Sequence, residues 1–398
     1  MIGSELPKGW DIQPLKEVVT STKGKKPKQL SELPFDNSIP YIDIKALEKD
    51  LIEQYADVES SKSFSPNDIA VVWDGARCGW VSKSKEGAIG STICALTPKN
   101  NIESNYLYYF LLEKYPIVNS KGRGVGIPHV DPTFFWDMEV PIPSPKEQKQ
   151  IAEKLDKLFG QIETIKEAFN KIPELLKNFR QQVLTYAVTG KLIESTPEPR
   201  MLGELIDELK YGTSKKADYD IEGFPVLRIP NINNGEIDSS DLKYVPLDDK
   251  EYNQLSLQEG DILVIRSNGS LSIVGQCAIV RKECENWVYA GYLIRIRCTH
   301  ELLPEYLNYI FQSYQVRKQI VKKSHSMSGV NNFSADKIKQ LEIAWYPVEV
   351  QKQIVEKLNS IFGKLNEIEK QYNTLCEKLD KLPQTLLCKA FKGELVYD

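Results

Sequence analysis

The side chains that usually carry catalysis are few in this sequence, and none stands in a spacing that catalysis uses. There are three histidines, His129, His300 and His325, and the acidic pair Asp248 and Asp249 lies in a polar stretch that we expect to be a solvated loop. The sequence has no HExxH motif, no Walker A loop, no GxGxxG turn and no Asn/Asp-Pro-Pro-Tyr/Phe motif of the amino-methyltransferases. We therefore predict that the chain has no catalytic residue and is not itself an enzyme.

Cysteine and metal chemistry is equally limited. The seven cysteines form no CxxC pair and no zinc-site spacing, so we predict no metal site and no cofactor in this chain. The cysteine count is odd, and the sequence shows neither a secretion-type leader nor an apolar run long enough to cross a bilayer. This pattern predicts free thiols in a cytoplasmic protein that has no contact with membranes.

The strongest pattern in the sequence is a helical segment that occurs twice. QKQIAEKLDKLFGQI begins at Gln148 and QKQIVEKLNSIFGKL begins at Gln351, and residues 148–192 align with residues 351–395 without a gap. About 18 of the 45 aligned pairs are identical, which indicates an internal duplication.

Each copy carries apolar residues at alternating steps of four and three, which is the pattern of a coiled-coil seam. The seam residues are Ile151, Leu155, Leu158, Ile162, Ile165 and Phe169 in the first copy, and Ile354, Leu358, Ile361, Leu365, Ile368 and Tyr372 in the second. Each helix needs a partner to bury this stripe, and the natural partner is the other copy. The alternative is that these are ordinary paired helices inside one core.

Local sequence signals mark the start of the first helix and predict interruptions in both helices. Ser144, Pro145 and Glu147 form a capping box with proline at the first helical position. Pro173 and Pro383 fall inside the helical pattern at different heights of the two copies, so we expect a kink or a break at each.

A block of about equal size precedes each helix, and the two blocks echo one another weakly. PNDIAVVWDGARCGWV at Pro66 resembles EGDILVIRSNGSLSIVG at Glu259, and IESNYLYYFL at Ile102 resembles LLPEYLNYIF at Leu302. Segments such as DIAVVW and DILVIR predict strands, and the tyrosine-rich segments predict amphipathic helices. The sequence therefore predicts an α+β protein in which two mixed globular blocks alternate with two long helical regions.

The chain resembles the specificity subunit of type I restriction–modification systems over nearly its whole length. The resemblance is carried by LPKGW at Leu6, PHV…VPIPSPKEQKQI at Pro128, GDILVIRSNGS at Gly260 and KLPQTLLCKAFKGEL at Lys381, and above all by their two-fold order. It implies two target-recognition domains, residues 1–143 and 202–346. It also implies two spacer arms, residues 144–201 and 347–398, which pair as an antiparallel coiled coil.

The same resemblance implies a function and a set of partners. The chain would read an asymmetric, bipartite target in double-stranded DNA. It would dock two methyltransferase subunits and the nuclease–translocase subunits. S-adenosylmethionine, ATP and Mg²⁺ would be bound by those partners, and none by this chain.

Candidate DNA contacts are the Lys, Arg, His, Asn and Ser side chains of polar loops, because these groups bind phosphates and base edges. In the first block they are Lys23, Lys25, Lys26, Lys28, Arg77, Lys121, Arg123 and His129. In the second they are Lys215, Lys216, Arg266, Ser267, Asn268, Ser270, Lys322, Lys323, His325, Asn331 and Asn332. Arg77 and Arg266 fall close to one another in the alignment of the blocks, just after a strand. For any single lysine, a solvated turn is the competing interpretation.

The charge balance bears on how DNA would be held. Residues 1–143 contain 16 Lys and Arg against 19 Asp and Glu, and residues 202–346 contain 17 against 20, so each block is slightly acidic. A self-sufficient DNA-binding domain is usually basic. Either basic patches are segregated locally from acidic surfaces, or partner subunits supply most of the phosphate neutralisation. We favour the second, with the first contributing, and expect the isolated chain to bind DNA weakly and with strong salt sensitivity.

Two other functions remain open on the sequence alone. A coiled-coil scaffold that binds only proteins would explain the arms, and a nuclease with an unrecognised site would explain an association with DNA. If no assembled complex selects a DNA sequence, the scaffold is favoured over DNA recognition. If the isolated chain cleaves DNA in a metal-dependent reaction, the nuclease is favoured.

Overall fold

The computed structural model describes residues 6–99, 101–124, 126–324 and 330–395, and the chain divides into two compact units. Unit 1 is built from Met1–Asn170 and Asn373–Asp398, and unit 2 from Lys171–Tyr372. Each unit therefore contains one globular block and parts of both helical arms. The four domain boundaries drawn from the sequence remain a prediction, because the compact units divide the chain within the arms.

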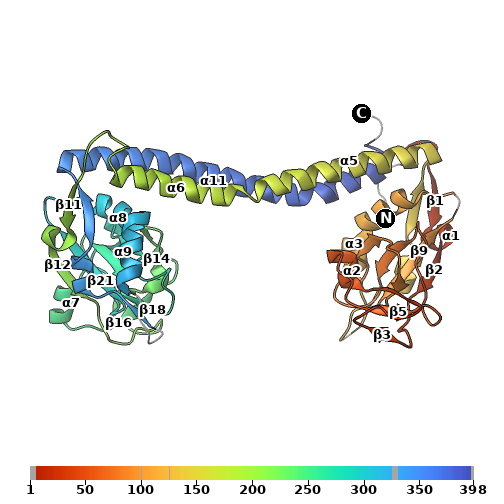
Figure 1. Ribbon diagram of the computed structural model, residues 1–398, viewed down its shortest axis with the longest axis horizontal. Helices are drawn as coiled ribbons and strands as arrows, with labels where there is room; N and C mark the ends of the chain where they lie inside the picture. The colour runs from red at the N-terminus through yellow and green to blue at the C-terminus, as the bar shows by residue number, and fades with distance from the viewer. Residues whose placement is uncertain (1–5, 100, 125, 325–329, 396–398) are drawn as a thin grey trace. The chain divides into compact units, whose positions relative to one another are not determined.

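Unit 1 is a mixed block of short strands and helices (Figure 1). Its elements are β1 (Asp11–Pro14), α1 (Leu15–Val18), β2 (Val19–Lys23), β3 (Leu30–Ser31), β4 (Ser38–Ile42), α2 (Ile44–Lys49), β5 (Tyr55–Asp57), β6 (Ile69–Val72), β7 (Val81–Lys83), β8 (Ala88–Ile89), β9 (Ile93–Pro98), α3 (Ser104–Ser120), α4 (Pro132–Trp136), β10 (Glu139–Ile142) and α5 (Pro145–Phe169). Four strands form a sheet in the order β2-β9-β6-β7, and a second sheet has the order β3-β5-β4-β8. Every residue of β6 is buried, and Tyr106, Leu107 and Phe110 of α3 pack into the same core.

Unit 2 repeats this topology with its own elements. They are α6 (Ile172–Val188), β11 (Glu198–Met201), η1 (Leu202–Leu205), β12 (Ile206–Tyr211), β13 (Phe224–Leu227), η2 (Ile229–Asn231), β14 (Ile232–Asn233), β15 (Glu236–Ile237), β16 (Lys243–Val245), α7 (Asp249–Leu255), β17 (Ile262–Ile265), β18 (Ser267–Asn268), β19 (Cys277–Ile279), η3 (Lys282–Cys284), β20 (Val288–Tyr289), β21 (Leu293–Cys298), α8 (Pro304–Gln312), α9 (Tyr314–Ser324), β22 (Asn331–Asn332), α10 (Ala335–Lys339), β23 (Glu342–Trp345) and α11 (Val348–Phe391), whose residues from Asn373 onward belong to unit 1.

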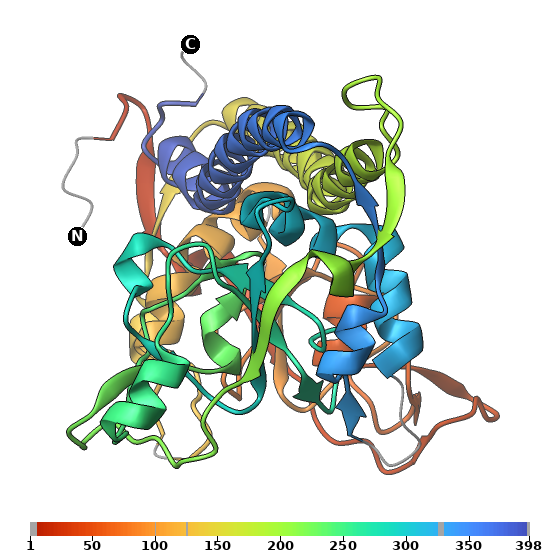
Figure 2. The ribbon, with the colours of Figure 1, turned by 90° about the vertical axis from the view of Figure 1, so that its left-hand side faces the viewer.

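The sheets of the two units correspond strand for strand. The order β12-β21-β17-β19 matches β2-β9-β6-β7, and the parallel pair β13·β20 matches β4·β8. In each unit the first and last strands of the block form an antiparallel ribbon, β1 with β10 and β11 with β23. Figure 2 turns unit 2 toward the viewer, and there β11 leads down from the arm into the block. The predicted α+β fold with an internal duplication is confirmed, and β11 belongs with the second block although it lies in the predicted first arm.

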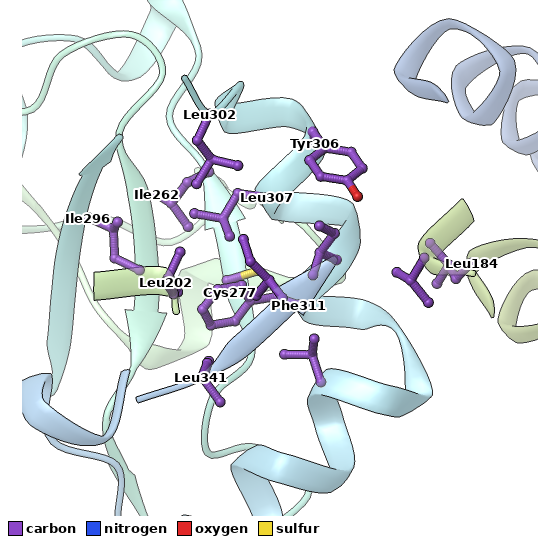
Figure 3. Close-up of a cluster of buried hydrophobic side chains, with 14 of the residues drawn as sticks. Leu184, Leu202, Ile262, Cys277, Ile296, Leu302, Tyr306, Leu307, Phe311 and Leu341 are labelled. Carbon is purple, nitrogen blue, oxygen red and sulfur yellow. The ribbon is translucent and has the colours of Figure 1, made fainter. Parts of the chain in front are cut away.

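The core of unit 2 joins the sheet, α8 and the arm. Figure 3 shows Ile262 and Ile296 of the sheet facing Leu307 and Phe311 of α8, with Leu184 of α6 at the side. All five side chains are almost completely buried. The arm is therefore part of the hydrophobic core of the unit and not a detached rod.

One glutamine at the start of each repeated helical motif fastens the arm to its block. The Gln148 amide accepts the Glu103 N–H (2.8 Å) and donates to the Asn101 and Pro143 carbonyls. At the equivalent position in unit 2, Gln351 accepts the Leu303 N–H (2.8 Å) and donates to two further carbonyls. Both side chains are buried, so each satisfies backbone groups that water cannot reach.

The helical regions pack against one another in each unit, and they run antiparallel. In unit 1, Ile151 and Leu155 of α5 share a core with Leu387 and Phe391 of α11, while Lys166 lies 3.8 Å from Asp380. The partner numbers fall as the α5 numbers rise, which defines the antiparallel direction. In unit 2, Val183 of α6 shares a core with Leu358 and Leu365 of α11, and Arg180 lies 3.7 Å from Glu369.

The two prolines of the helical regions differ in whether they interrupt the helix. The first helical region is broken where predicted: α5 ends at Phe169 and α6 begins at Ile172, with Pro173 in its first turn. The helix does not break at Pro383, because α11 continues through it, so of the expected kink or break the break is excluded at this position. Leu387 and Phe391 pack into the core of unit 1 beyond this proline, and their burial holds the last turns helical against its cost of ~3 kcal/mol.

The acidic pair Asp248 and Asp249 does not lie in the solvated loop expected from the sequence, but at the start of a helix. The Asp248 carboxylate accepts the Glu251 N–H (2.8 Å) and caps α7, of which Asp249 is the first residue.

Among the described residues, every helix is too short or too polar to span a bilayer. The same residues contain no group of three or more His, Cys, Asp or Glu side chains that could hold a metal ion.

Candidate nucleic-acid interface

Three of the predicted DNA-binding segments of the first block meet at the end of strand β6. The Trp73 N–H donates to the Thr92 carbonyl (2.8 Å), and the Val130 N–H donates to the Trp73 carbonyl (2.9 Å). Lys23, the last residue of β2, reaches Asp74 with 2.6 Å between Nζ and Oδ2. The end of β2, the loop after β6 and the segment around residue 130 therefore form one edge of unit 1.

Several cations on this edge are held by acidic or aromatic neighbours. Arg77 forms an ion pair with Glu48 of α2, and the Arg123 guanidinium lies 2.6 Å from the Asp131 carboxylate. Lys121 places its ammonium 4.1 Å from the centre of the Phe134 ring. A phosphate would therefore have to compete with these partners for Arg77 and Arg123.

The remaining candidates of unit 1 differ in exposure. Lys25, Lys26 and Lys28 are exposed in the loop that follows β2. His129 is half-buried, and its backbone bridges to both Arg123 and Asp74. The three lysines are available to a polyanion, whereas the His129 backbone holds the edge together.

Arg266 occupies the corresponding edge of unit 2. Its N–H donates to the Tyr292 carbonyl (2.9 Å), and its carbonyl accepts the Phe333 N–H (2.7 Å). Its guanidinium carbon lies 4.8 Å from the centre of the Tyr211 ring, and Nη1 lies 3.5 Å from the Gly291 carbonyl. Nε is buried without a hydrogen-bond partner within the described parts of the chain. This side chain is held by a ring and one long contact, and within the described ranges Nη2 has no hydrogen-bond partner.

The residues after Arg266 form a short ladder with the segment around residue 331. Ser267 pairs with Asn332, and Asn268 pairs with Asn331. Asn331 is buried and donates to the Gly269 carbonyl (3.0 Å), so its amide closes the loop and is occupied. Asn332 is exposed beside it.

The other candidates of unit 2 lie on three segments. The Asn268 side chain accepts the Ser270 N–H (2.9 Å), and the Ser270 hydroxyl lies 2.7 Å from that of Ser272. Lys215 forms an ion pair with Glu251 (2.5 Å), and Lys216 is exposed. Lys322 and Lys323 are in the last turn of α9. His325 lies outside the described residues.

The strand registers relate the two edges residue by residue. Val71 and Lys23 both pair with Cys94, and Val264 and Tyr211 both pair with Ile294. Lys23 therefore corresponds to Tyr211, and Trp73 corresponds to Arg266, whereas Arg77 lies four residues farther along its loop.

A cation–aromatic pair is thus present in both units with its members exchanged. In unit 1 the cation is on β2 and the ring follows β6, with 5.6 Å between Lys23 Nζ and the centre of the Trp73 ring. In unit 2 the ring is on β12 and the cation follows β17. Trp73 and Tyr211 were not identified from the sequence, because aromatic residues at strand ends are normally assigned to the core. The alignment of the two repeated strand segments is the signal for Trp73, and strand register is the signal that finds Tyr211.

The predicted seam residues divide into two groups. Ile151, Leu155, Ile162, Ile354, Leu358 and Leu365 are buried, and Leu158, Phe169, Ile361 and Tyr372 are half-buried. Ile165 and its equivalent Ile368 are exceptions, since 42% and 47% of their surface is exposed. The apolar stripe is therefore buried where the arms adjoin the blocks, and it is exposed to solvent at the equivalent positions Ile165 and Ile368.

The cysteines do not offer a nucleophile at these edges. Burial raises the pKa of the Cys94 thiol to about 11 and that of Cys277 to about 12. Both are protonated at neutral pH, and a protonated thiol is a poor nucleophile.

Comparison with known proteins assigns this architecture to a family. The family described as "Type I restriction modification DNA specificity domain" matches residues 7–174 and 195–378. The EcoKI specificity subunit of Escherichia coli K12 is 33% identical over 99% of this chain and 91% of its own length. The StySPI specificity subunit of Salmonella potsdam is 30% identical, over 98% of this chain and 90% of its own length.

Solved structures share the fold at low sequence identity. The HsdS subunit from Thermoanaerobacter tengcongensis superposes with a TM-score of 0.66 at 17% identity, covering 99% of both chains. A chain from a structural study of the assembly and conformational transition of the type I R-M system gives 0.73 at 18% identity, covering 98% of this chain and 99% of its own. The chain belongs to the family of type I restriction–modification DNA specificity subunits, the non-catalytic recognition component of a multi-subunit enzyme.

Proposed function

We propose that the chain reads an asymmetric, two-part sequence in duplex DNA, with one globular block reading each part. The exchanged cation–aromatic pair is the observation that carries this proposal. The same place in the fold presents a tryptophan in unit 1 and an arginine in unit 2. Base edges are distinguished by the donors and acceptors that face them, so two blocks that differ at this place should select different bases.

The contacts divide between positioning and reading. Lys25, Lys26 and Lys28 in unit 1 and Lys322 in unit 2, which are exposed, bind phosphates together with the half-buried Lys323. Arg266 reads a base edge, because its fork of donors is only partly engaged and arginine suits the two acceptors of guanine. Ser267, Asn268 and Asn332 are on the same edge and add shorter polar contacts.

The arms dock the partners that carry out the chemistry. Besides Ile165 and Ile368, large apolar side chains are exposed on the arm helices, among them Leu175, Phe179 and Leu375. Exposed apolar side chains on a surface helix favour a protein partner. Two methyltransferase subunits dock there, and nuclease–translocase subunits join them. S-adenosylmethionine, ATP and Mg²⁺ are bound by those subunits in the cytoplasm, where the DNA is.

The methylome of a host cell tests this function. A host expressing the chain with its neighbouring methyltransferase is expected to carry methylated adenines within one asymmetric, two-part motif. That motif should vanish when the chain is omitted and the methyltransferase is kept. An unchanged methylome, with the methyltransferase active and bound to the chain, would favour a scaffold that binds only proteins.

A further inference from the structure

A pocket of about 540 Å³ opens beside the reading edge of unit 2. Its walls come from the loop after β12, the end of β13 with η2, β16, and the turn before β21. Four of its thirteen lining residues are basic, namely Lys215, Lys216, Arg228 and Lys243, and none is acidic. Such a concentration of positive charge stands out in a block whose net charge is slightly negative.

Two of these cations are fixed by carboxylates outside the lining. Lys215 lies 2.5 Å from Glu251, and the Arg228 Nη2 lies 3.0 Å from Asp241. Hydrogen bonds from Tyr219 and Arg228 lower the pKa of Asp241, which keeps it ionised at neutral pH. The carboxylates therefore hold two cations in place at the rim.

The other two cations are not in direct contact with a carboxylate of the described residues, although the charge of Lys243 adds to the lowering of the pKa of Asp241. Lys216 is exposed, and Lys243 lies 4.6 Å above the Tyr219 ring. Neither forms an ion pair with any residue that the structure describes. The pocket therefore carries a surplus of two positive charges, enough to attract an anion of matching charge.

The pocket shares a wall with the proposed reader. Gly291 and Tyr292 line it, and they are the two residues whose carbonyls face the side chain and the backbone N–H of Arg266. The Tyr292 ring is 62% exposed at this border. A group bound in the pocket would thus lie next to a group bound by Arg266.

We infer that this pocket seats the sugar–phosphate backbone of the half-site that Arg266 reads. Phosphate contacts fix the register of a protein on DNA, and base contacts select the sequence. A basic pocket beside a partly engaged arginine provides both within one surface. The inference rests on the proposed function and adds Arg228 and Lys243 to the DNA-binding residues.

Unit 1 lacks the same arrangement. The registers of β4·β8 and β13·β20 place Asp43 where unit 2 has Arg228. Asp43 accepts the Ala46 N–H (2.9 Å) and caps α2, so an anion would meet a carboxylate there. The phosphate seat is therefore a property of the second block alone.

The test uses the complex of the full chain with its methyltransferase, on a duplex containing the motif and on an unrelated duplex. A chain with Lys216→Gln and Lys243→Gln is expected to bind both duplexes roughly 5- to 50-fold more weakly at moderate salt, with its sequence preference unchanged. The slope of log affinity against log salt should become shallower by about 1.8, since each phosphate contact contributes about 0.9. A chain with Lys216→Arg and Lys243→Arg keeps the charge and should keep the slope.

The matched control removes two exposed lysines of the same block outside the pocket, by Lys250→Gln and Lys282→Gln. If the pocket variant loses no more affinity and no more slope than this control, the phosphate seat is refuted while the proposed function stands. If the unsubstituted complex itself selects no sequence, the proposed function fails, and the inference with it.

Discussion

A chain with Arg266→Ala is expected to lose its selectivity in one part of the bipartite target and to keep it in the other. The guanidinium is held by the Tyr211 ring and by a 3.5 Å contact with the Gly291 carbonyl, and the residue's backbone is fixed on both sides. A bidentate arginine contact discriminates between bases by about 1–3 kcal/mol, so selection at the contacted position should fall roughly 5- to 150-fold. The measurement is the methylation rate on duplexes that vary one base pair at a time.

Two further variants separate reading from simple attraction. Arg266→Lys keeps the positive charge but loses the planar fork, and it should lose most of the discrimination. Arg281→Ala removes another arginine of the same unit, one that pairs with Glu236 and Glu305, and should leave the motif intact. A uniform loss of affinity in the Arg266 variants, with both parts of the motif still selected, would contradict the reading role.

A second large effect is expected in the interior of unit 2, where Arg295→Ala should lower the free energy of unfolding by about 3–5 kcal/mol. Arg295 is almost completely buried, and its guanidinium lies 2.6 Å from Glu208 and donates to the Ser256 carbonyl at 2.8 Å. The substitution leaves the Ser256 carbonyl and Glu208 with Arg297 as their remaining arginine donor, and it leaves an empty space the size of the side chain. Urea-induced unfolding followed by circular dichroism measures the loss.

The matched variant Arg295→Met tests the cause of that loss. Methionine fills most of the volume without a charge, and replacing a buried ion by an apolar side chain often costs little. The equivalent residue of unit 1 is Ala95, which is fully buried in a sheet of the same order, so the fold itself does not need the cation. Arg295→Ala and Arg295→Met chains of the same stability as the unsubstituted chain would show that this ion pair adds nothing.

The sequence predicts the arms well because their pattern is local. Steps of three and four residues determine which face of a helix is apolar, and the capping box at Ser144 and Glu147 is present as expected. Pro173 interrupts its helix for a local reason too. Pro383 does not interrupt α11. The helix continues there because residues far away in the sequence pack against its last turns, and no local pattern contains that information.

The recognition edges could be predicted only in part. Segments such as RSNGS are recognisable as polar loops after a strand, which identifies Arg266. The aligned segments that begin at Pro66 and Glu259 already set Trp73 opposite Arg266. That Lys23 and Tyr211 lie beside these two residues depends on strand pairing, which the sequence does not show. Arg228 and Lys243 come together only because β13 and β16 pair in the folded block.

The alternation of Arg295 and Arg297 in GYLIRIR is another feature whose meaning depends on the fold. A strand with charged residues at every second position usually faces water on that side. In unit 2 this face is instead covered, and the Asp261 carboxylate lies 2.8 Å from Arg297 Nε. The two carboxylates that pair with these arginines are Glu208 of β12 and Asp261, the residue before β17, and both are far away in the sequence.

The central claim is that each globular block reads its own half of the DNA target, and exchanging one block tests it most directly. Residues 202–346 would be replaced by the corresponding block of a specificity subunit with a different target, and the methylome would be sequenced. The account predicts that one half of the methylated motif changes while the other half stays the same. A motif that changes in both halves, or in neither, would contradict it.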